Sequence, residues 1–157
     1  MLIRRARHED ADQACAVLRR SIAELCLDDH HDDPAILRMW LGNKTPAVVG
    51  GWIADPDIIV LVAVEDDTVL AVGAVRPHGE ITLNYVSPDA RFKGVSRALL
   101  AQLEATAHEL GNDSCHLQST ETARRFYLAC GYEQVGMAQR KHGTTGSYPM
   151  LKRFVRD

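Results

Sequence analysis

Apolar and polar positions alternate along this chain with two different periods, which predict both helices and strands. Over residues 10–27 and again over 95–110, apolar residues recur every three or four positions, which places them on one helix face. The segment 58–64 is continuously apolar and rich in β-branched residues, which favours a strand buried on both faces. The chain therefore combines amphipathic helices with a strand inside a sheet.

Turn and capping residues separate further elements. Asp33-Pro34 and Thr45-Pro46 each place a capping side chain before a proline, which is a typical helix start. Such signals predict helices over 34–41, 46–52 and 120–130, and Thr120 is the expected cap of the last helix. They predict strands over 2–6, 69–76, 114–118, 132–137 and 147–155. Loops are expected over 28–33 and 140–146.

The segment 80–86 alternates with the period of a strand. Its residues 81, 83 and 85 are apolar or aromatic, so Glu80 and Asn84 are expected to share the opposite face. With the strands 58–64 and 69–76 before it, this segment forms an antiparallel meander. The element order predicts one domain over 1–157 with a mixed α/β (α+β) fold, in which helices flank a central, mostly antiparallel sheet.

Composition and charge narrow the classes of function. Of the 157 residues 46% are hydrophobic and 25% charged, and the net charge of −3 supplies no basic face for nucleic acid. No apolar run approaches the ~18 residues that a membrane span needs. The first residues do not resemble a signal peptide, so we expect a cytoplasmic protein whose four cysteines are free thiols.

The most informative segment is the turn between the strand 80–86 and the helix at 95. Gly94 and the small Ser96 would let a ligand approach the free N–H groups at the helix start, and Arg91, Lys93 and Arg97 surround that end with positive charge. This arrangement suits a pyrophosphate. An ordinary surface turn with a glycine and arginines remains equally open from the local pattern alone.

Two sequence blocks resemble the motifs of the GNAT superfamily of N-acetyltransferases. The first block is Val86-x-Pro88-x-x-Arg91-x-x-Gly94-x-Ser96-x-x-Leu99-Leu100, and the second is Ser119-Thr120-x-Thr122-Ala123-x-x-Phe126-Tyr127-x-x-x-Gly131-Tyr132. The likeness in element order covers nearly the whole chain. Ser96 departs from the usual Gly or Ala, and Thr120 stands where many members have Asn.

The resemblance implies acetyl-CoA as cosubstrate and a sheet that splays between its fourth and fifth strands. Pantetheine would lie in the gap as an added strand, with the acetyl carbonyl near a strand bulge whose N–H groups stabilise the oxyanion. The cofactor-binding residues that it implies are Tyr85, Val86, Arg91, Phe92, Lys93, Gly94, Val95, Ser96, Arg97, Thr120 and Tyr127.

The resemblance also implies catalytic roles. Tyr127 matches the family tyrosine that donates to the leaving thiolate, although a packing role beside Phe126 is the alternative. Glu80 is a candidate base, acting directly or through water, and a solvated strand-end charge is the alternative. Asn84 would orient a water or a polar acceptor.

Three further expectations concern ligands and partners. The segment 28–33, Asp-Asp-His-His-Asp-Asp, consists of residue types that bind metal ions. Adjacent ligands rarely converge on one ion, so we expect a solvated loop and no metal there. Trp40 and Trp52 are expected in the core, and a place in the lining of the acceptor pocket is the alternative for each. A homodimer is possible.

The expected activity is acetyl transfer from acetyl-CoA to the amine of a small molecule, by direct attack through a tetrahedral intermediate. Alternatives are a CoA-binding sensor without turnover, transfer to a protein N-terminus, a lysine or a hydroxyl, and use of a longer acyl-CoA.

Overall fold

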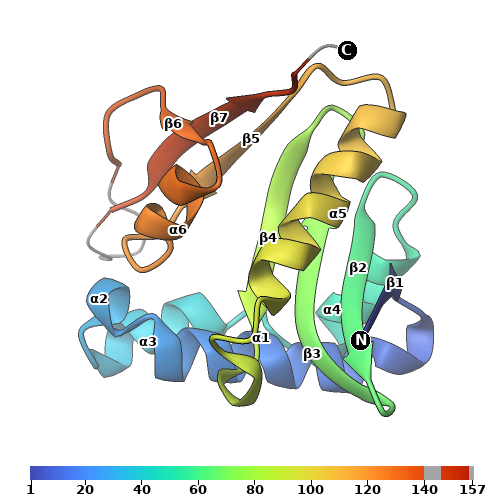
Figure 1. Ribbon diagram of the computed structural model, residues 1–157. Coiled ribbons are helices and arrows are strands. Elements are labelled where there is room, and N and C mark those ends of the chain that lie inside the picture. The colour runs from blue at the N-terminus through green and yellow to red at the C-terminus, as the bar shows by residue number, and fades with distance from the viewer. Residues whose placement is uncertain (140–145, 156–157) are drawn as a thin grey trace.

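A computed structural model describes residues 1–139 and 146–155 of the chain and shows one open sheet flanked by helices (Figure 1). Within these residues the strand order is β1-β2-β3-β4-β5-β7-β6, and only β4 and β5 pair in parallel. The strands are β1 (Leu2–Arg5), β2 (Ile59–Glu65), β3 (Thr68–Val75), β4 (Glu80–Val86), β5 (Ser114–Ser119), β6 (Glu133–Gln134) and β7 (Tyr148–Arg153).

Helices cover both faces of the sheet. They are α1 (Ala11–Leu25), α2 (Leu27–His30), α3 (Pro34–Leu41), α4 (Pro46–Ala54), α5 (Val95–Glu109) and α6 (Arg124–Ala129), with 3-10 turns at His8–Asp10 and Pro88–Ala90. Leu99 and Leu103 of α5 pack on one face, and Leu18 of α1 with Val49 of α4 pack on the other. None of the described helices is long and apolar enough to span a bilayer.

Several predicted boundaries are confirmed by cap geometry. The Asp33 carboxylate accepts from the N–H of Ala35 at 2.9 Å at the start of α3, and Thr45 Oγ1 accepts from Val48 N–H at 3.2 Å at the start of α4. These short-range bonds satisfy helix-start N–H groups that have no partner inside the helix.

β4 and β5 separate along their length, as expected for the fourth and fifth strands. Their pairing consists of Glu80 with His116 and Ile81 with Leu117, after which β5 continues away from β4 (Figure 1). On its other side β5 pairs with β7 over its whole length. Among the described residues, no strand therefore pairs with the edge of β4 beyond Ile81 on this side.

The predicted alternation in β4 is wrong, because the strand contains a bulge. Ala74 of β3 pairs with Leu83 while the next residue, Val75, pairs with Ile81, so Thr82 is the extra residue. Ile81 consequently packs in the core under α5, whereas Leu83 packs against the core under α1. Glu80 and Asn84 thus project from opposite faces of the sheet rather than from one.

Other predicted elements differ in extent. The helix predicted over 10–27 ends at Leu25, and the short helix α2 occupies part of the segment expected as the loop 28–33. The strand predicted over 132–137 is reduced to two residues, and the last strand ends at Arg153. The loop predicted at 140–146 falls, except for Gly146, outside the described residues.

Thr120 does not cap α6 directly. The helix begins at Arg124, and Thr120 Oγ1 accepts instead from the N–H of Ala123 at 3.1 Å. The residues between them form a turn that is bound by a side chain distant in sequence, as described below, and this long-range contact is the reason that the local capping signal misplaced the helix start.

Candidate active site

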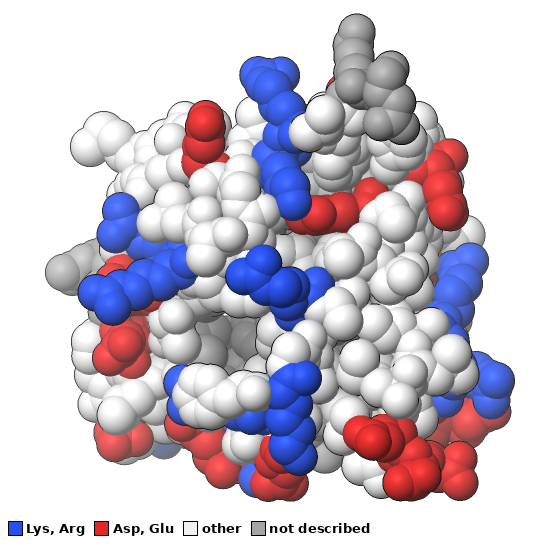
Figure 2. All heavy atoms as spheres, viewed as in Figure 1, with Lys and Arg blue, Asp and Glu red and all other residues white. Residues whose placement is uncertain are grey.

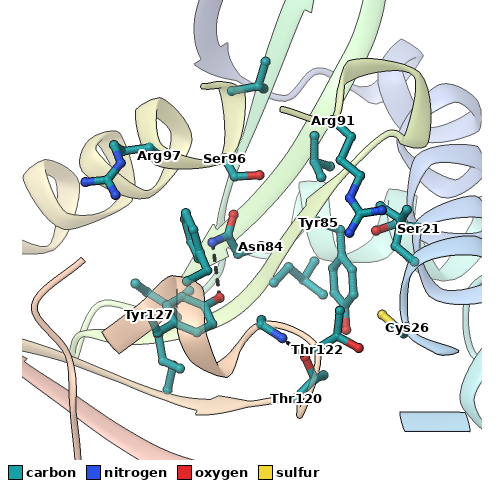
Figure 3. A pocket seen from close by; sticks show the side chains of 18 of the residues that line it. Ser21, Cys26, Asn84, Tyr85, Arg91, Ser96, Arg97, Thr120, Thr122 and Tyr127 are labelled. Carbon is teal, nitrogen blue, oxygen red and sulfur yellow. Dashed lines mark hydrogen bonds between the residues drawn. The ribbon is translucent and has the colours of Figure 1, made fainter. Parts of the chain in front are cut away.

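A cavity of about 390 Å³ opens where β4 and β5 separate, between the start of α5 and the helix α6 (Figure 3). Side chains from α1, β4, β5 and the turn before α5 line it. Of the predicted cofactor and catalytic residues, the lining includes Asn84, Tyr85, Val86, Arg91, Phe92, Gly94, Val95, Ser96, Arg97, Thr120 and Tyr127. Lys93 belongs to the same turn but does not line the cavity, and Glu80 lies elsewhere.

The turn before α5 contains two residues with positive φ. Gly94 adopts φ +77 as the residue preceding the helix, and Phe92 adopts φ +65, which is unusual for a residue with a side chain. A Cβ at Gly94 would meet no atom within 4 Å, so the space beside this backbone is open. The glycine is therefore required by its dihedral angle and not by neighbouring atoms.

Positive charge and free N–H groups surround this end of the cavity. Ala98 N–H bonds back to Gly94 O at 3.1 Å, so the N–H groups of the three preceding residues have no partner within the helix. Figure 3 shows Arg91 and Ser96 directed toward the cavity, and Figure 2 shows basic side chains bordering a hollow in this face. No Asp or Glu is among the described residues lining the cavity. The site therefore favours an anion at the helix start.

A second group of contacts holds the turn in place. Ser87 Oγ accepts from the N–H of Asp89 at 3.2 Å, and Asp89 pairs with Arg20 of α1 at 2.8 Å. The hydrogen bond from Arg20 lowers the pKa of Asp89. The guanidinium of Arg91 lies 4.5 Å from the centre of the Phe92 ring, which is 90% exposed.

At the other end of the cavity, Asn84 and Tyr127 form a hydrogen-bonded pair. Asn84 Nδ2 donates to Tyr127 Oη at 3.2 Å (Figure 3). The Tyr127 ring is buried and makes edge contacts with Phe126 and Tyr132, at centroid distances of 5.3 and 5.5 Å. Burial raises the pKa of Tyr127 to about 12, and the bond from Asn84 opposes that rise. The phenol is thus neutral at pH 7, with its proton available to a third group.

A second cavity of about 560 Å³ adjoins the first. The two share the β4 bulge, because Ile81, Thr82, Leu83 and Tyr85 line both. Glu80 lines only the second cavity, where its carboxylate lies 3.7 Å from Arg76 Nε and 4.0 Å from His116 Nε2. The structure therefore brings Asn84 and Tyr127 together and places Glu80 on the other side of the bulge.

Trp40 lies in a cavity, which was the alternative to its expected core position. It lines the second cavity together with Lys44, whereas Trp52 packs against the core as expected. The helix α3, to which Trp40 belongs, contains no buried residue, so its apolar side chains are not part of the core.

The solvated loop predicted at 28–33 is wrong for Asp29 and His30, whereas Asp28 and residues 31–33 are exposed as expected. The Asp29 carboxylate is buried and accepts from Glu121 N–H at 2.8 Å, Thr122 N–H at 3.1 Å and Thr122 Oγ1 at 2.6 Å. His30 is buried, with Nδ1 accepting from Asp32 N–H at 3.0 Å and Nε2 3.1 Å from Ala23 O. Asp29 therefore attaches the turn before α6 to α2, and His30 connects α2 to the end of α1 and to the turn that follows it.

Comparison with known proteins agrees with this geometry. The model of the acetyltransferase (GNAT) domain family matches residues 28–154. Among curated protein sequences none matches significantly.

Solved structures resemble the fold over nearly its whole length. A GCN5-related N-acetyltransferase from Rhodopseudomonas palustris has a TM-score of 0.86 at 20% identity, covering 98% of this chain and 95% of that chain. The PaiA N-acetyltransferase from Thermoplasma acidophilum in complex with coenzyme A has a TM-score of 0.83 at 18% identity, covering 98% of both chains. The aminoglycoside 6'-N-acetyltransferase from Enterococcus faecium has a TM-score of 0.73 at 18% identity, covering 100% of this chain and 99% of that chain. The family match over most of the chain, together with the splayed sheet and the turn before α5, establishes that this protein belongs to the GNAT family of acetyltransferases.

Proposed function

We propose that the protein transfers an acetyl group from acetyl-CoA to the amine of a small molecule. The observation that carries this proposal is the first cavity, which runs from the free N–H groups of α5 to the Asn84–Tyr127 pair and has no carboxylate among its described lining residues. A pyrophosphate fits the first end, and the unpaired edge of β4 at Tyr85 and Val86 offers backbone groups to the pantetheine amides.

The reaction forms one C–N bond and breaks one C–S bond. The amine nitrogen attacks the acetyl carbonyl carbon, and the oxyanion of the tetrahedral intermediate lies near the bulge at Thr82, where the extra residue leaves backbone polar groups outside the sheet pairing. Collapse releases the CoA thiolate. The amine loses one proton to the base, and the released thiolate takes one proton from water.

Tyr127 acts on the departing sulfur chiefly as a hydrogen-bond donor. Its pKa of about 12 exceeds the pKa of about 8.5 of a free thiol, so complete transfer of the phenol proton would be uphill by about 5 kcal/mol. A hydrogen bond from the neutral phenol stabilises the developing thiolate without that cost. Asn84 is a positioning residue, because it fixes the phenol oxygen as an acceptor and leaves its proton for the sulfur.

Glu80 is the proposed base on the acceptor side. A primary amine with a pKa near ~10 is only ~0.1% neutral at pH 7, so removal of its proton by a carboxylate or a bound water assists attack. Glu80 lines the second cavity, which meets the first at the bulge, and the amine would approach the thioester from there.

The second cavity suits a small amine that is cationic in solution. Glu80 supplies negative charge and Trp40 an aromatic surface, whereas the Lys44 ammonium donates to Asn43 Oδ1 at 2.5 Å and lies 6.0 Å from the centre of the Trp52 ring. These contacts hold the Lys44 ammonium beside Asn43 and Trp52.

Thermal unfolding with acetyl-CoA, followed by an assay of thiol release, tests the proposal. Ligand at about 100 times its dissociation constant adds about 2.7 kcal/mol to the free energy of unfolding. We expect this stabilisation together with thiol release that depends on an added amine from a panel of small polyamines, amino sugars and amino acids. Stabilisation with no turnover on any amine, N-terminal peptide or lysine peptide would indicate a CoA sensor and contradict the proposal.

A further inference from the structure

Two histidines and a glutamate from different segments of the chain converge beside the second cavity. His78 lies in the turn between β3 and β4, Glu80 begins β4, and His116 belongs to β5. Their ligand atoms all lie within 4.8 Å of one another. The ring centroids of His78 and His116 are 5.5 Å apart, and His116 Nε2 is 4.0 Å from the Glu80 carboxylate. We call this group the His78–Glu80–His116 cluster.

The backbone fixes the positions from which these side chains project. Glu80 and His116 are direct partners in the parallel pairing, and His116 N–H donates to Gly79 O at 3.1 Å. Gly79 has φ +95, and a Cβ there would lie 2.8 Å from Ser114 O, so only glycine allows this close approach of turn and strand. Gly79 N–H also donates to Arg76 O at 2.9 Å. The backbone therefore holds the three side chains next to one another.

The ligand set matches a particular class of ion. Neutral imidazole nitrogens and a carboxylate oxygen bind Zn²⁺, and two His with one Glu is an established set that leaves a fourth position open. Ligand atoms around a tetrahedral Zn²⁺ lie about 3.4 Å apart, so separations of up to 4.8 Å in the cluster need to shorten by up to about 1.4 Å. His78 is exposed and the other two are half-buried, which gives the ion a path from solvent.

We propose that the His78–Glu80–His116 cluster binds a divalent transition-metal ion of the Zn²⁺ class. This proposal does not depend on acetyl transfer, because it rests on the cluster alone. Glu80 lines the second cavity, so the ion would lie at the rim of that cavity. Where Glu80 serves as the base, a bound ion would occupy its lone pairs and inhibit the reaction.

Arg76 provides an internal competitor for the same carboxylate. Its Nε lies 3.7 Å from Glu80 Oε1, so its positive charge opposes the binding of a cation at this carboxylate. Replacing Arg76 with an uncharged side chain should therefore strengthen metal binding. Zinc bound by an unrelated surface histidine would keep the same affinity after this replacement.

Calorimetric titration of the untagged, metal-free chain with ZnCl₂ at about pH 7.5 tests the proposal. We expect one zinc per chain. Glu80→Gln, His78→Gln and His116→Gln should each weaken binding about tenfold or more, whereas Arg76→Gln should tighten it. His8→Gln is the matched control, because His8 is an exposed histidine outside the cluster, and its affinity should equal that of the wild type.

Three outcomes would overturn the proposal. They are the absence of saturable heat up to about 1 mM zinc, equal affinity in all the cluster variants, and a loss with His8→Gln as large as with His116→Gln. Circular dichroism and thermal unfolding of each variant show whether it is folded. Co²⁺ supplies a second readout, since a four-coordinate site gives intense visible absorption bands that Glu80→Gln should remove.

Discussion

The side-chain amide nitrogen of Asn84 lies 3.2 Å from the phenol oxygen of Tyr127 and donates a hydrogen bond to it. An amide NH₂ group has no lone pair to accept with, so the phenol oxygen must be the acceptor. The hydroxyl proton of Tyr127 is then free to point into the cavity that both residues line. This pair therefore sets the direction in which the phenol donates.

Tyr127→Phe should lower kcat by about 100-fold while leaving the Kd for acetyl-CoA nearly unchanged, because the ring packing remains and only the donor to sulfur is lost. Steady-state kinetics and calorimetric binding measure the two effects. Tyr132→Phe is the matched control, since Tyr132 donates to Glu104 at 2.7 Å and does not line the cavity. It should reduce stability and not turnover. Equal turnover in Tyr127→Phe and the wild type would remove Tyr127 from the chemistry.

Asn84→Ala should lower kcat about tenfold, the effect of losing one hydrogen bond that orients the phenol. Asn84→Asp keeps the side-chain size but replaces the donor with an acceptor, so the phenol proton should turn toward the carboxylate and away from the sulfur. We therefore expect Asn84→Asp to be slower than Asn84→Ala. A faster aspartate variant would contradict the positioning role.

Gly94→Asp and Gly94→Asn separate charge from conformation at the start of α5. Both side chains tolerate positive φ better than other residues and have nearly the same size, and the Cβ meets no neighbouring atom. The aspartate should weaken acetyl-CoA binding about tenfold more than the asparagine, because only the aspartate repels a pyrophosphate. Similar Kd values for the two variants would show that no anion binds at this turn.

The activity should show no alkaline loss from Tyr127 up to about pH 10.5. The raised pKa of about 12 keeps the neutral, donating phenol fully populated below that range, whereas an unperturbed tyrosine would be half ionised near its ordinary value of 10. A pH profile of kcat with a tight-binding acceptor measures this. A fall with a midpoint near pH 10 that is absent in Tyr127→Phe would show that the phenol is not shielded as described.

The sequence predicted those features that local chemistry determines. The turn at Gly94 was recognised because free N–H groups, small residues and arginines lie within a few positions of one another. The caps at Asp33 and Thr45 were found for the same reason. The family resemblance supplied the splay of β4 from β5, which no pattern within either strand reveals.

Features that depend on distant contacts were not predicted. The bulge at Thr82 arises from the register with β3. The sequence of residues 80–85 alternates strictly between apolar and polar positions, so it gives no indication of an extra residue. Asp29 and Thr122 are 93 positions apart, so the acidic segment gave no sign that its carboxylate binds the turn before α6. The meeting of His78 and His116 likewise depends on the parallel pairing of β4 and β5.

A crystal structure with acetyl-CoA tests the central claim most directly. The account predicts that the pyrophosphate contacts the backbone N–H groups at the start of α5, and that the thioester sulfur lies within about 3.5 Å of Tyr127 Oη. Acetyl-CoA bound with its phosphates away from Gly94, or with its sulfur far from Tyr127, would contradict the account.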